Sequence, residues 1–257
     1  METITSVQNP KIKRLLLLRE KSRLRREEGV FTVEGRRELE HCIEAGYEVV
    51  TAFASDPEAV PDGVKSIPVS AEVYARIACR ETTEGIVAEV RSRSLSLSDI
   101  PEVENPLFIV LESVEKPGNL GAVLRTADAA GATAVIVCDP LTDLYNPNII
   151  RSSIGAVFTV PAVACTSEEA IDYFKARGVQ ILTAQLQDSS LYYDRDMTCG
   201  TAIVMGTEST GLTEIWRRAA DAHVRIPMLG LLDSLNVSVS AAILAFEAVR
   251  QRQTPLK

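Results

Sequence analysis

The last third of the chain carries the two stretches that decide its fold, VMGTESTGL (residues 204–212) and IPMLGLLDSLNVSVSAAILAFEAVR (residues 226–250). Each begins as a buried strand, passes through a loop of small residues and opens a helix. A third stretch, PGNLGAVLRTADAAGA (residues 117–132), follows the apolar run LFIVLE (residues 107–112) in the same order. Because α/β proteins build ligand sites where such loops leave one edge of a sheet, we expect the three loops to form one site.

Strands alternate with helices through the whole second half of the chain. The expected strands are LFIVLE (107–112), TAVIVC (133–138), VFTVPAV (157–163), VQILTA (179–184), TAIVMG (201–206) and HVRIP (223–227). Nearly continuous apolar strands separated by helices predict a mostly parallel sheet covered on both faces. The closing helix, from about residue 235 to residue 251, has two apolar faces, which fits a subunit interface or packing within one chain.

The first part of the chain predicts a smaller α/β domain over residues 1–95. The pattern is helical from residue 9 to about residue 26, and further strands and helices follow. These are the strand FTVEG (31–35), the helix RRELEHCIEAG (36–46), EVVTAFAS (48–55), the helix-like AEVYARIAC (71–79) and GIVAEV (85–90). Residues 96–106 are rich in Ser, Pro and charge and form the expected linker, which leaves residues 107–257 for the second domain.

Composition excludes several classes of protein. The chain has 257 residues, of which 46% are hydrophobic, and no run of about 18 apolar residues suits a membrane span. The four leucines of residues 15–18 are too few for a signal peptide, so we expect a cytoplasmic protein. The 5 cysteines are scattered and only 2 histidines are present, which predicts reduced thiols and no metal site.

Charge is unevenly placed along the chain. The net charge is -8, yet residues 1–37 carry ten Lys or Arg residues against five Glu residues. A basic head on an acidic body suits local contact with phosphates, although a solvated amphipathic helix is the commoner explanation of a charge run alone. The candidate contact residues are Lys11, Lys13, Arg14, Arg36 and Arg37.

The first two loops offer groups that suit a charged ligand. Asn119 lies where a helix N-cap is expected, and Arg125 lies one turn beyond Gly121, so a guanidinium stands near a helix N-terminus, as a phosphate requires. A structural cap with an exposed arginine is the commoner explanation of this pattern. In the second loop, Glu208 could orient a ligand or cap the helix expected near Leu212.

The third loop is the most specific of the three. Asp233, Ser234 and Asn236 crowd the N-terminus of a long helix, where one polar residue would be enough to cap it. We expect a pocket whose backbone groups hold an adenine-like or amino-acid-like ligand. The GxGxxG, GxxxxGK[ST], GxSxG and HExxH patterns are absent from their expected contexts, which excludes dinucleotide oxidoreduction, P-loop hydrolysis and metalloprotease chemistry.

At these residues the sequence resembles the SpoU or TrmH family of RNA 2′-O-ribose methyltransferases, within the SPOUT class. The similarity extends over roughly residues 105–250 and rests on four blocks in the family order. They are NLGAVLRTADAAG (119–131), RSSIGAVFTVP (151–161), VMGTESTGL (204–212) and the stretch of residues 226–250. More weakly, VQNPKIKRLLLL (7–18) and VEGRRELEHCIEAG (33–46) are similar to the small ribosomal-protein-like substrate-binding domain of many members.

The resemblance implies a fold and a cofactor that the residue pattern alone does not. Elementary rules predict an unknotted doubly wound sheet, whereas this family threads its C-terminal segment through a loop to form a deep trefoil knot. The knot forms the pocket for S-adenosylmethionine, the methyl donor. By motif, Gly206, Ile226 and Leu235 line that pocket, with Met228 nearby. The resemblance also implies a homodimer and an RNA substrate, with ribosomal RNA favoured over transfer RNA.

The resemblance assigns the catalytic role to Arg125, with Asn119, Glu208, Ser234 and Asn236 positioning the ribose and the arginine. Because a guanidinium is almost never neutral in a protein, we favour Arg125 as a clamp on an RNA phosphate. Its charge makes the ribose hydroxyl more acidic, and a phosphate oxygen or water accepts the proton.

Three alternatives stay open at this point. The first is a 2′-O-methyltransferase of transfer RNA. The second is a knotted enzyme that methylates a base nitrogen, in which a carboxylate such as Glu208 or Asp233 would matter more than Arg125. The third is a catalytically silent RNA-binding protein, such as a ribosome-assembly factor.

Overall fold

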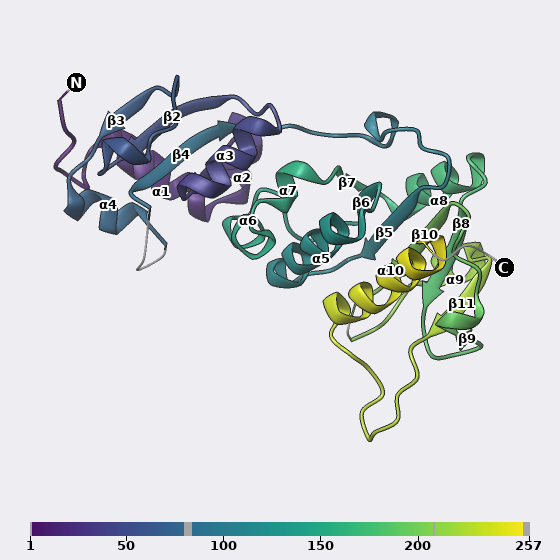
Figure 1. Ribbon diagram of the computed structural model, residues 1–257. Helices are drawn as coiled ribbons and strands as arrows, with labels where there is room; N and C mark the ends of the chain where they lie inside the picture. Colours follow the sequence, from purple (N-terminus) through teal and green to yellow (C-terminus); the bar gives the residue numbers. More distant parts are fainter. Residues whose placement is uncertain (1, 80–83, 208, 254–257) are drawn as a thin grey trace. The chain divides into compact units, whose positions relative to one another are not determined.

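The structure is a computed structural model that describes residues 2–79, 84–207 and 209–253 (Figure 1). The chain forms two compact units. The first unit contains Met1–Arg93 and Asp143–Thr159, and the second contains Ser94–Thr142 and Val160–Lys257. Among the described residues, no helix combines the length and the apolar character that crossing a membrane requires.

The second unit is built on a seven-stranded sheet of order β7-β6-β5-β10-β8-β11-β9 in which every pairing is parallel. This confirms the predicted parallel sheet. The strands are β5 (Leu107–Glu112), β6 (Ala134–Cys138), β7 (Ala162–Cys165), β8 (Gln180–Ala184), β9 (Ser190–Leu191), β10 (Thr201–Met205) and β11 (Ala222–Arg225).

Helices cover both faces of this sheet, as its continuous apolar strands require. The helices are α5 (Pro117–Ala130), α8 (Ser167–Ala176), α9 (Glu214–Ala219) and α10 (Val237–Gln253), with short 3₁₀ turns η2 (Leu97–Asp99) and η3 (Tyr192–Asp194). Helices α5 and α10 pack against each other, with α10 on β5 and β10 and α5 on β6, whereas α8 and α9 pack against each other and against β8 (Figure 1). Alternate residues of β5, Phe108 and Val110, belong to the core under α8 and α9.

The predicted strand over residues 157–163 is wrong. Helix α7 (Ala156–Thr159) takes the first half, and β7 begins at Ala162, after Pro161. The Phe158 ring packs 5.8 Å from the ring of Phe31 in the first unit, so helix packing rather than a sheet buries it. An apolar run of this length does not distinguish a strand from a short buried helix.

The first unit has a four-stranded sheet of order β1-β4-β2-β3. Strand β4 pairs antiparallel with β1 and β2, and β2 pairs parallel with β3. The strands are β1 (Val30–Glu34), β2 (Val49–Ala54), β3 (Ser66–Pro68) and β4 (Ile86–Arg91); the helices are α1 (Pro10–Glu20), α2 (Ser22–Glu28), α3 (Arg36–Glu44), α4 (Ala71–Ile77) and η1 (Pro57–Ala59).

The helix predicted from residue 9 to residue 26 is divided at Lys21, whose backbone is extended. The buried Arg25 side chain explains the break, because its guanidinium donates to the carbonyl oxygens of Leu18 and Arg19 at 2.6 Å and 2.9 Å. These carbonyls lie at the end of α1 and would otherwise lack partners. The same guanidinium forms an ion pair with Asp143 at 2.6 Å.

Residues 143–159 join the first unit through buried polar and aromatic contacts. The ring of Tyr145 stacks on Phe31 with centroids 4.2 Å apart, and its hydroxyl lies 3.2 Å from that of Tyr47. Helices α6 (Pro147–Ser153) and α7 lie in this segment. The chain therefore leaves the second unit after β6, contributes to the first, and returns at β7.

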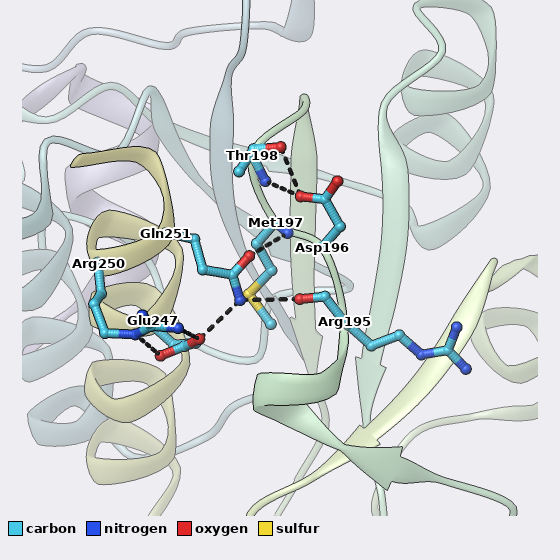
Figure 2. A network of polar contacts seen from close by, with 7 residues as sticks. All are labelled: Arg195, Asp196, Met197, Thr198, Glu247, Arg250 and Gln251. Carbon is cyan, nitrogen blue, oxygen red and sulfur yellow. Dashed lines mark hydrogen bonds and ion pairs between the residues drawn. The ribbon is translucent and has the colours of Figure 1, made fainter. Parts of the chain in front are cut away.

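The end of α10 is held to the loop before β10 by a polar network (Figure 2). Gln251 accepts from the backbone N–H of Met197 at 2.8 Å and donates to the carbonyl of Arg195 at 2.9 Å. It also donates to the buried Glu247, which pairs with Arg250 at 2.7 Å. This network holds the closing helix against the sheet.

Glu247→Gln is expected to lower the free energy of unfolding by about 1 kcal/mol at pH 7, because the lost ion pair faces an Arg250 side chain that is 60% exposed. Hydrogen bonding to Arg250 holds the pKa of Glu247 below its ordinary value of 4.5. A depressed folded pKa contributes stability above the ordinary value and loses it as the pH falls through the folded pKa. Urea unfolding of both proteins should therefore show a difference at pH 7 that shrinks as the pH falls below 4.5; a difference that does not change with pH would contradict this account.

Candidate active site

The three polar loops leave the sheet at one edge. Strands β5, β10, β8 and β11 are neighbours and parallel, so their carboxyl ends lie side by side. The loop after β5 leads into α5, the loop after β10 leads into α9, and the segment after β11 leads into α10. The expected convergence of these loops is confirmed.

A cavity of about 380 Å³ opens at this edge, and we call it the larger cavity. Its volume lies in the range of small-molecule sites. The four residues predicted to bind the cofactor all line it: Gly206, Ile226, Met228 and Leu235. Ser234, predicted as a catalytic residue, lines it as well. The last residues of β8 and the residues that follow them complete the wall.

Gln185 lies in the wall of the larger cavity and was not predicted from the sequence. Its side-chain Nε2 donates to the carbonyl of Gln187 at 3.0 Å. Its buried Oε1 has no hydrogen-bond donor among the residues that the structure describes. A buried acceptor without a donor is costly, and this oxygen is closed to solvent, so a ligand reaches it only if the side chain turns toward the cavity.

A second cavity of about 220 Å³, the smaller cavity, adjoins the larger one. It is lined by Glu115 and Lys116 of the loop after β5 and by the predicted Asn119 in the first turn of α5. The two cavities share lining residues of the loop after β10 and the first residue of α10. The shared residues are Gly206, Thr207, Ser209 and Val237. A ligand in one cavity therefore lies beside a ligand in the other.

Two of the predicted catalytic residues meet beside the smaller cavity, which Asn119 lines. The side-chain Nδ2 of Asn236 donates to Oδ1 of Asn119 at 3.2 Å, although 117 positions separate them in sequence. Asn236 Oδ1 accepts from the backbone N–H of Ser238 at 2.9 Å and so caps α10, which fixes the orientation of the amide. The expectation that Asn119 caps α5 is wrong, because Lys116 occupies the N-cap and Pro117 is the first helical residue.

The other predicted catalytic residues lie as follows. Arg125 is exposed on α5 and lines neither cavity, and its side chain forms no hydrogen bond or ion pair with another described residue. The Ser234 hydroxyl donates to Asp233 at 3.3 Å. Glu208 lies outside the described residues.

Several basic side chains of the first unit are engaged in internal contacts. Arg14 pairs with Glu89 at 2.6 Å and with Glu28, and Arg36 pairs with Glu40 at 2.7 Å. Lys11, Lys13 and Arg37 are exposed, and their side chains form no ion pair with any acidic residue that the structure describes. The local excess of positive charge is therefore partly neutralised within the unit itself.

Comparison with known proteins gives one family match in each part of the chain. Residues 106–246 match the SpoU rRNA Methylase family, and residues 9–88 match the MRM3-like substrate binding domain. The first match contains every residue that lines the two cavities, and it spans more than half of the chain.

Three relatives cover nearly the whole chain. The 23S rRNA (guanosine(2553)-2'-O)-methyltransferase of Bacillus subtilis strain 168 is 29% identical and aligns over 96% of this chain and 98% of its own length. The 23S rRNA (uridine(2479)-2'-O)-methyltransferase of Streptomyces viridochromogenes is 32% identical, over 87% and 84%. The AdoMet-bound rRNA methyltransferase of Sinorhizobium meliloti has a similar structure, with a TM-score of 0.89, 31% identity and 97% coverage of both chains.

Proposed function

Because the chain belongs to the SpoU rRNA Methylase family, we propose that it transfers the methyl group of S-adenosylmethionine to a ribose 2′-hydroxyl of ribosomal RNA. The observation that carries the proposal is the pair of adjoining cavities with one shared wall, which brings a donor and an acceptor side by side. Relatives with a guanosine and a uridine target share this chain's family, so the proposal concerns the ribose and not a particular base.

The larger cavity fits S-adenosylmethionine. The buried Gln185 Oε1 lacks a donor among the described residues, and we propose that it turns toward one of the two amino groups of the ligand on binding. Arg217 and Asp233 also line the cavity, and their opposite charges match the carboxylate and ammonium of a methionine moiety. We assign cofactor binding to Gly206, Ile226, Met228 and Leu235 here, and the trefoil knot implied by the resemblance belongs to the same proposal.

The bound cofactor supplies an electrophilic methyl group on a sulfonium sulfur. The chain must align the ribose oxygen with that methyl group, because an in-line displacement depends on geometry. We assign this alignment to the Asn119–Asn236 amide pair, which lies beside the wall shared by the cavities. The exposed guanidinium of Arg125 holds an RNA phosphate and acidifies the hydroxyl, while a phosphate oxygen or water takes the proton.

Asn236→Asp separates alignment from helix capping. The aspartate still accepts from the backbone N–H of Ser238, so we expect a change in unfolding free energy of less than about 0.5 kcal/mol. It has lost the donor to Asn119 Oδ1, so methyl transfer should fall by roughly tenfold to a hundredfold. Initial rates and urea unfolding of the wild-type protein, Asn236→Asp and Asn236→Ala measure both effects. Wild-type rates in Asn236→Asp would rule out a role for the amide donor.

The first unit supplies the RNA contacts of this proposal. Lys11, Lys13 and Arg37 are exposed, so they are the basic residues best suited to phosphate contact. Arg14 and Arg36 take part in ion pairs with their own unit and contribute less. Since each released phosphate counterion steepens the salt dependence of binding by about one unit, replacing Lys11 and Lys13 together with Ala should reduce that slope by about two.

A second copy of the chain is the proposed partner. Leu229 and Leu232, in the segment after β11, are 97% and 76% exposed, and Phe246 on α10 is 46% exposed. Apolar side chains of this size at the edge of a ligand site favour a covered surface, and a homodimer covers it. Sedimentation of the wild-type protein and of Leu229→Asp/Leu232→Asp should give a dimer and a monomer; a monomeric wild-type protein would contradict the dimer.

The RNA target is tested by supplying methyl-labelled S-adenosylmethionine together with unmodified 23S ribosomal RNA or transfer RNA. Label in ribosomal RNA is the expected result, and it fits the proposed location in the cytoplasm, where bacterial ribosomes are assembled. Label confined to transfer RNA would show that the substrate is transfer RNA and not ribosomal RNA. Binding of the cofactor and RNA without transfer to either RNA would favour the silent RNA-binding protein.

A further inference from the structure

A buried carboxylate at the end of β5 makes contacts that the proposed reaction does not yet use. Glu112 is 2% exposed. Its Oε2 accepts from the backbone N–H of Thr213 at 2.8 Å, and its Oε1 accepts from the Thr213 hydroxyl. No ion pair joins Glu112 to a basic side chain in the described part of the chain. Burying a carboxylate on neutral donors alone is expensive, which argues that its contacts serve a purpose.

Thr213 closes the loop that separates the two cavities. It occupies the N-cap of α9, yet its side chain forms no cap hydrogen bond with that helix. The hydroxyl is directed to Glu112 instead. The loop that it closes is a compact turn, in which Gly211 N–H donates to the carbonyl of Thr207 at 3.1 Å. Its conformation is therefore anchored at one end by Glu112.

Further neutral donors hold the surroundings of this carboxylate. The Ser167 hydroxyl, at the start of α8, lies 3.5 Å from Glu112 Oε1 and 2.6 Å from a carboxylate oxygen of Asp139. It accepts from the indole N–H of the buried Trp216 at 2.9 Å. Trp216 belongs to α9, so the helix that follows the loop is fixed to the same cluster as Thr213.

The two ends of this contact lead to the two walls of the smaller cavity. The chain runs from Glu112 directly into Val114, Glu115 and Lys116, which line one wall. The loop that Thr213 closes supplies Gly206, Thr207 and Ser209 of the wall shared with the larger cavity. A hydrogen-bonded bridge from Glu112 to Thr213 therefore sets the position of one wall relative to the other.

We propose that Glu112 is a positioning residue, which through Thr213 holds the loop after β10 in the conformation that binds the cofactor beside the ribose. The inference rests on the proposed function, because it assigns the larger cavity to S-adenosylmethionine. Glu112 itself contacts neither substrate: it lines neither cavity, and its effect passes through the loop.

The test uses two variants of the bridge and one matched control. Thr213→Val removes the hydroxyl at nearly constant volume and leaves the backbone N–H, and Glu112→Gln removes the charge at constant volume. The control is Glu247→Gln, which removes another buried carboxylate of the same unit, in contact with Arg250 and Gln251 near the end of α10 (Figure 2). Thr213→Ser, which keeps the hydroxyl, serves as the conservative variant.

Calorimetric titration with S-adenosylmethionine, steady-state methyl transfer and thermal melting are measured on all five proteins. We expect Thr213→Val and Glu112→Gln to raise the dissociation constant of the cofactor and to lower kcat, each by about tenfold, while the KM for RNA stays within twofold. Thr213→Ser should restore both. Glu247→Gln should lower the melting temperature alone.

A purely structural role predicts a different pattern. If both bridge variants melt earlier but keep wild-type cofactor affinity and kcat, as the control does, Glu112 is not a positioning residue. Since Thr213 is exposed, Thr213→Val decides the question even where Glu112→Gln fails to fold. Failure of the proposed function is read separately, as absence of cofactor binding by the wild-type protein, and that result would remove this inference as well.

Discussion

Arg125→Ala should lower methyl transfer to RNA by about 100-fold to 1,000-fold and leave the affinity for S-adenosylmethionine unchanged. The side chain is exposed on α5 and lines neither cavity, so its removal leaves the cofactor site intact. In the proposed mechanism, what is lost is a fixed positive charge that holds an RNA phosphate and favours loss of the hydroxyl proton. Single-turnover rates with saturating cofactor measure the loss directly.

Arg125→Lys refines this prediction. A lysine keeps the charge but cannot make two parallel hydrogen bonds to a phosphate, so it should recover only part of the rate. Arg218→Ala is the control, since Arg218 is a 79% exposed arginine of the same unit paired with Glu214. Equal rates for Arg125→Ala and the control would eliminate Arg125 as a catalytic residue and would favour a carboxylate base.

Gly206→Ala should weaken binding of S-adenosylmethionine by at least tenfold. A Cβ at Gly206 would lie 2.3 Å from the carbonyl carbon and oxygen of Gly211 and 2.6 Å from the backbone nitrogen of Leu212. Those neighbours are backbone atoms, so the turn itself must move, at a cost of about 1–3 kcal/mol. Because the turn lines both cavities, the displacement should reach the proposed sites of the cofactor and the ribose together.

Gly118→Ala provides the matched control for this substitution. A Cβ at Gly118, in the first turn of α5, meets nothing within 4 Å, and alanine favours the helix. Calorimetric titration of both variants should therefore show wild-type affinity for Gly118→Ala and a loss for Gly206→Ala. Wild-type affinity in Gly206→Ala would place the cofactor away from this turn.

The sheet of the second unit could be predicted from sequence because its strands are buried on both faces. β5 has the predicted bounds, and β6, β8, β10 and β11 lie within two residues of them. The strand predicted over residues 157–163 failed because its apolar residues are buried by aromatic packing on Phe31, a contact between residues more than 120 positions apart. The same long-range contacts bring residues 143–159 into the first unit, and no local pattern encodes them.

In the candidate site too, residues marked by a local motif could be predicted from the sequence, whereas residues whose role depends on long-range contacts could not. Motif residues identified Asn119, Gly206 and Asn236; the structure places Asn119 and Gly206 in the walls of adjoining cavities and joins Asn236 to Asn119 by a hydrogen bond. Gln185 follows its strand without any motif, and its buried oxygen becomes noticeable only once the cavity is formed. Glu112 ends an apolar strand, and nothing in the neighbouring sequence marks it. Its proposed role depends on Thr213, 101 positions away, so it becomes visible only in the folded chain.

The position of the transferred methyl group tests the central claim most directly. Ribosomal RNA is methylated with labelled S-adenosylmethionine and then hydrolysed with alkali, which needs a free 2′-hydroxyl at each cleaved linkage. Ribose 2′-O-methylation predicts that the label stays in alkali-resistant dinucleotides. Label released only as mononucleotides would show that a base was methylated and would contradict the proposed function.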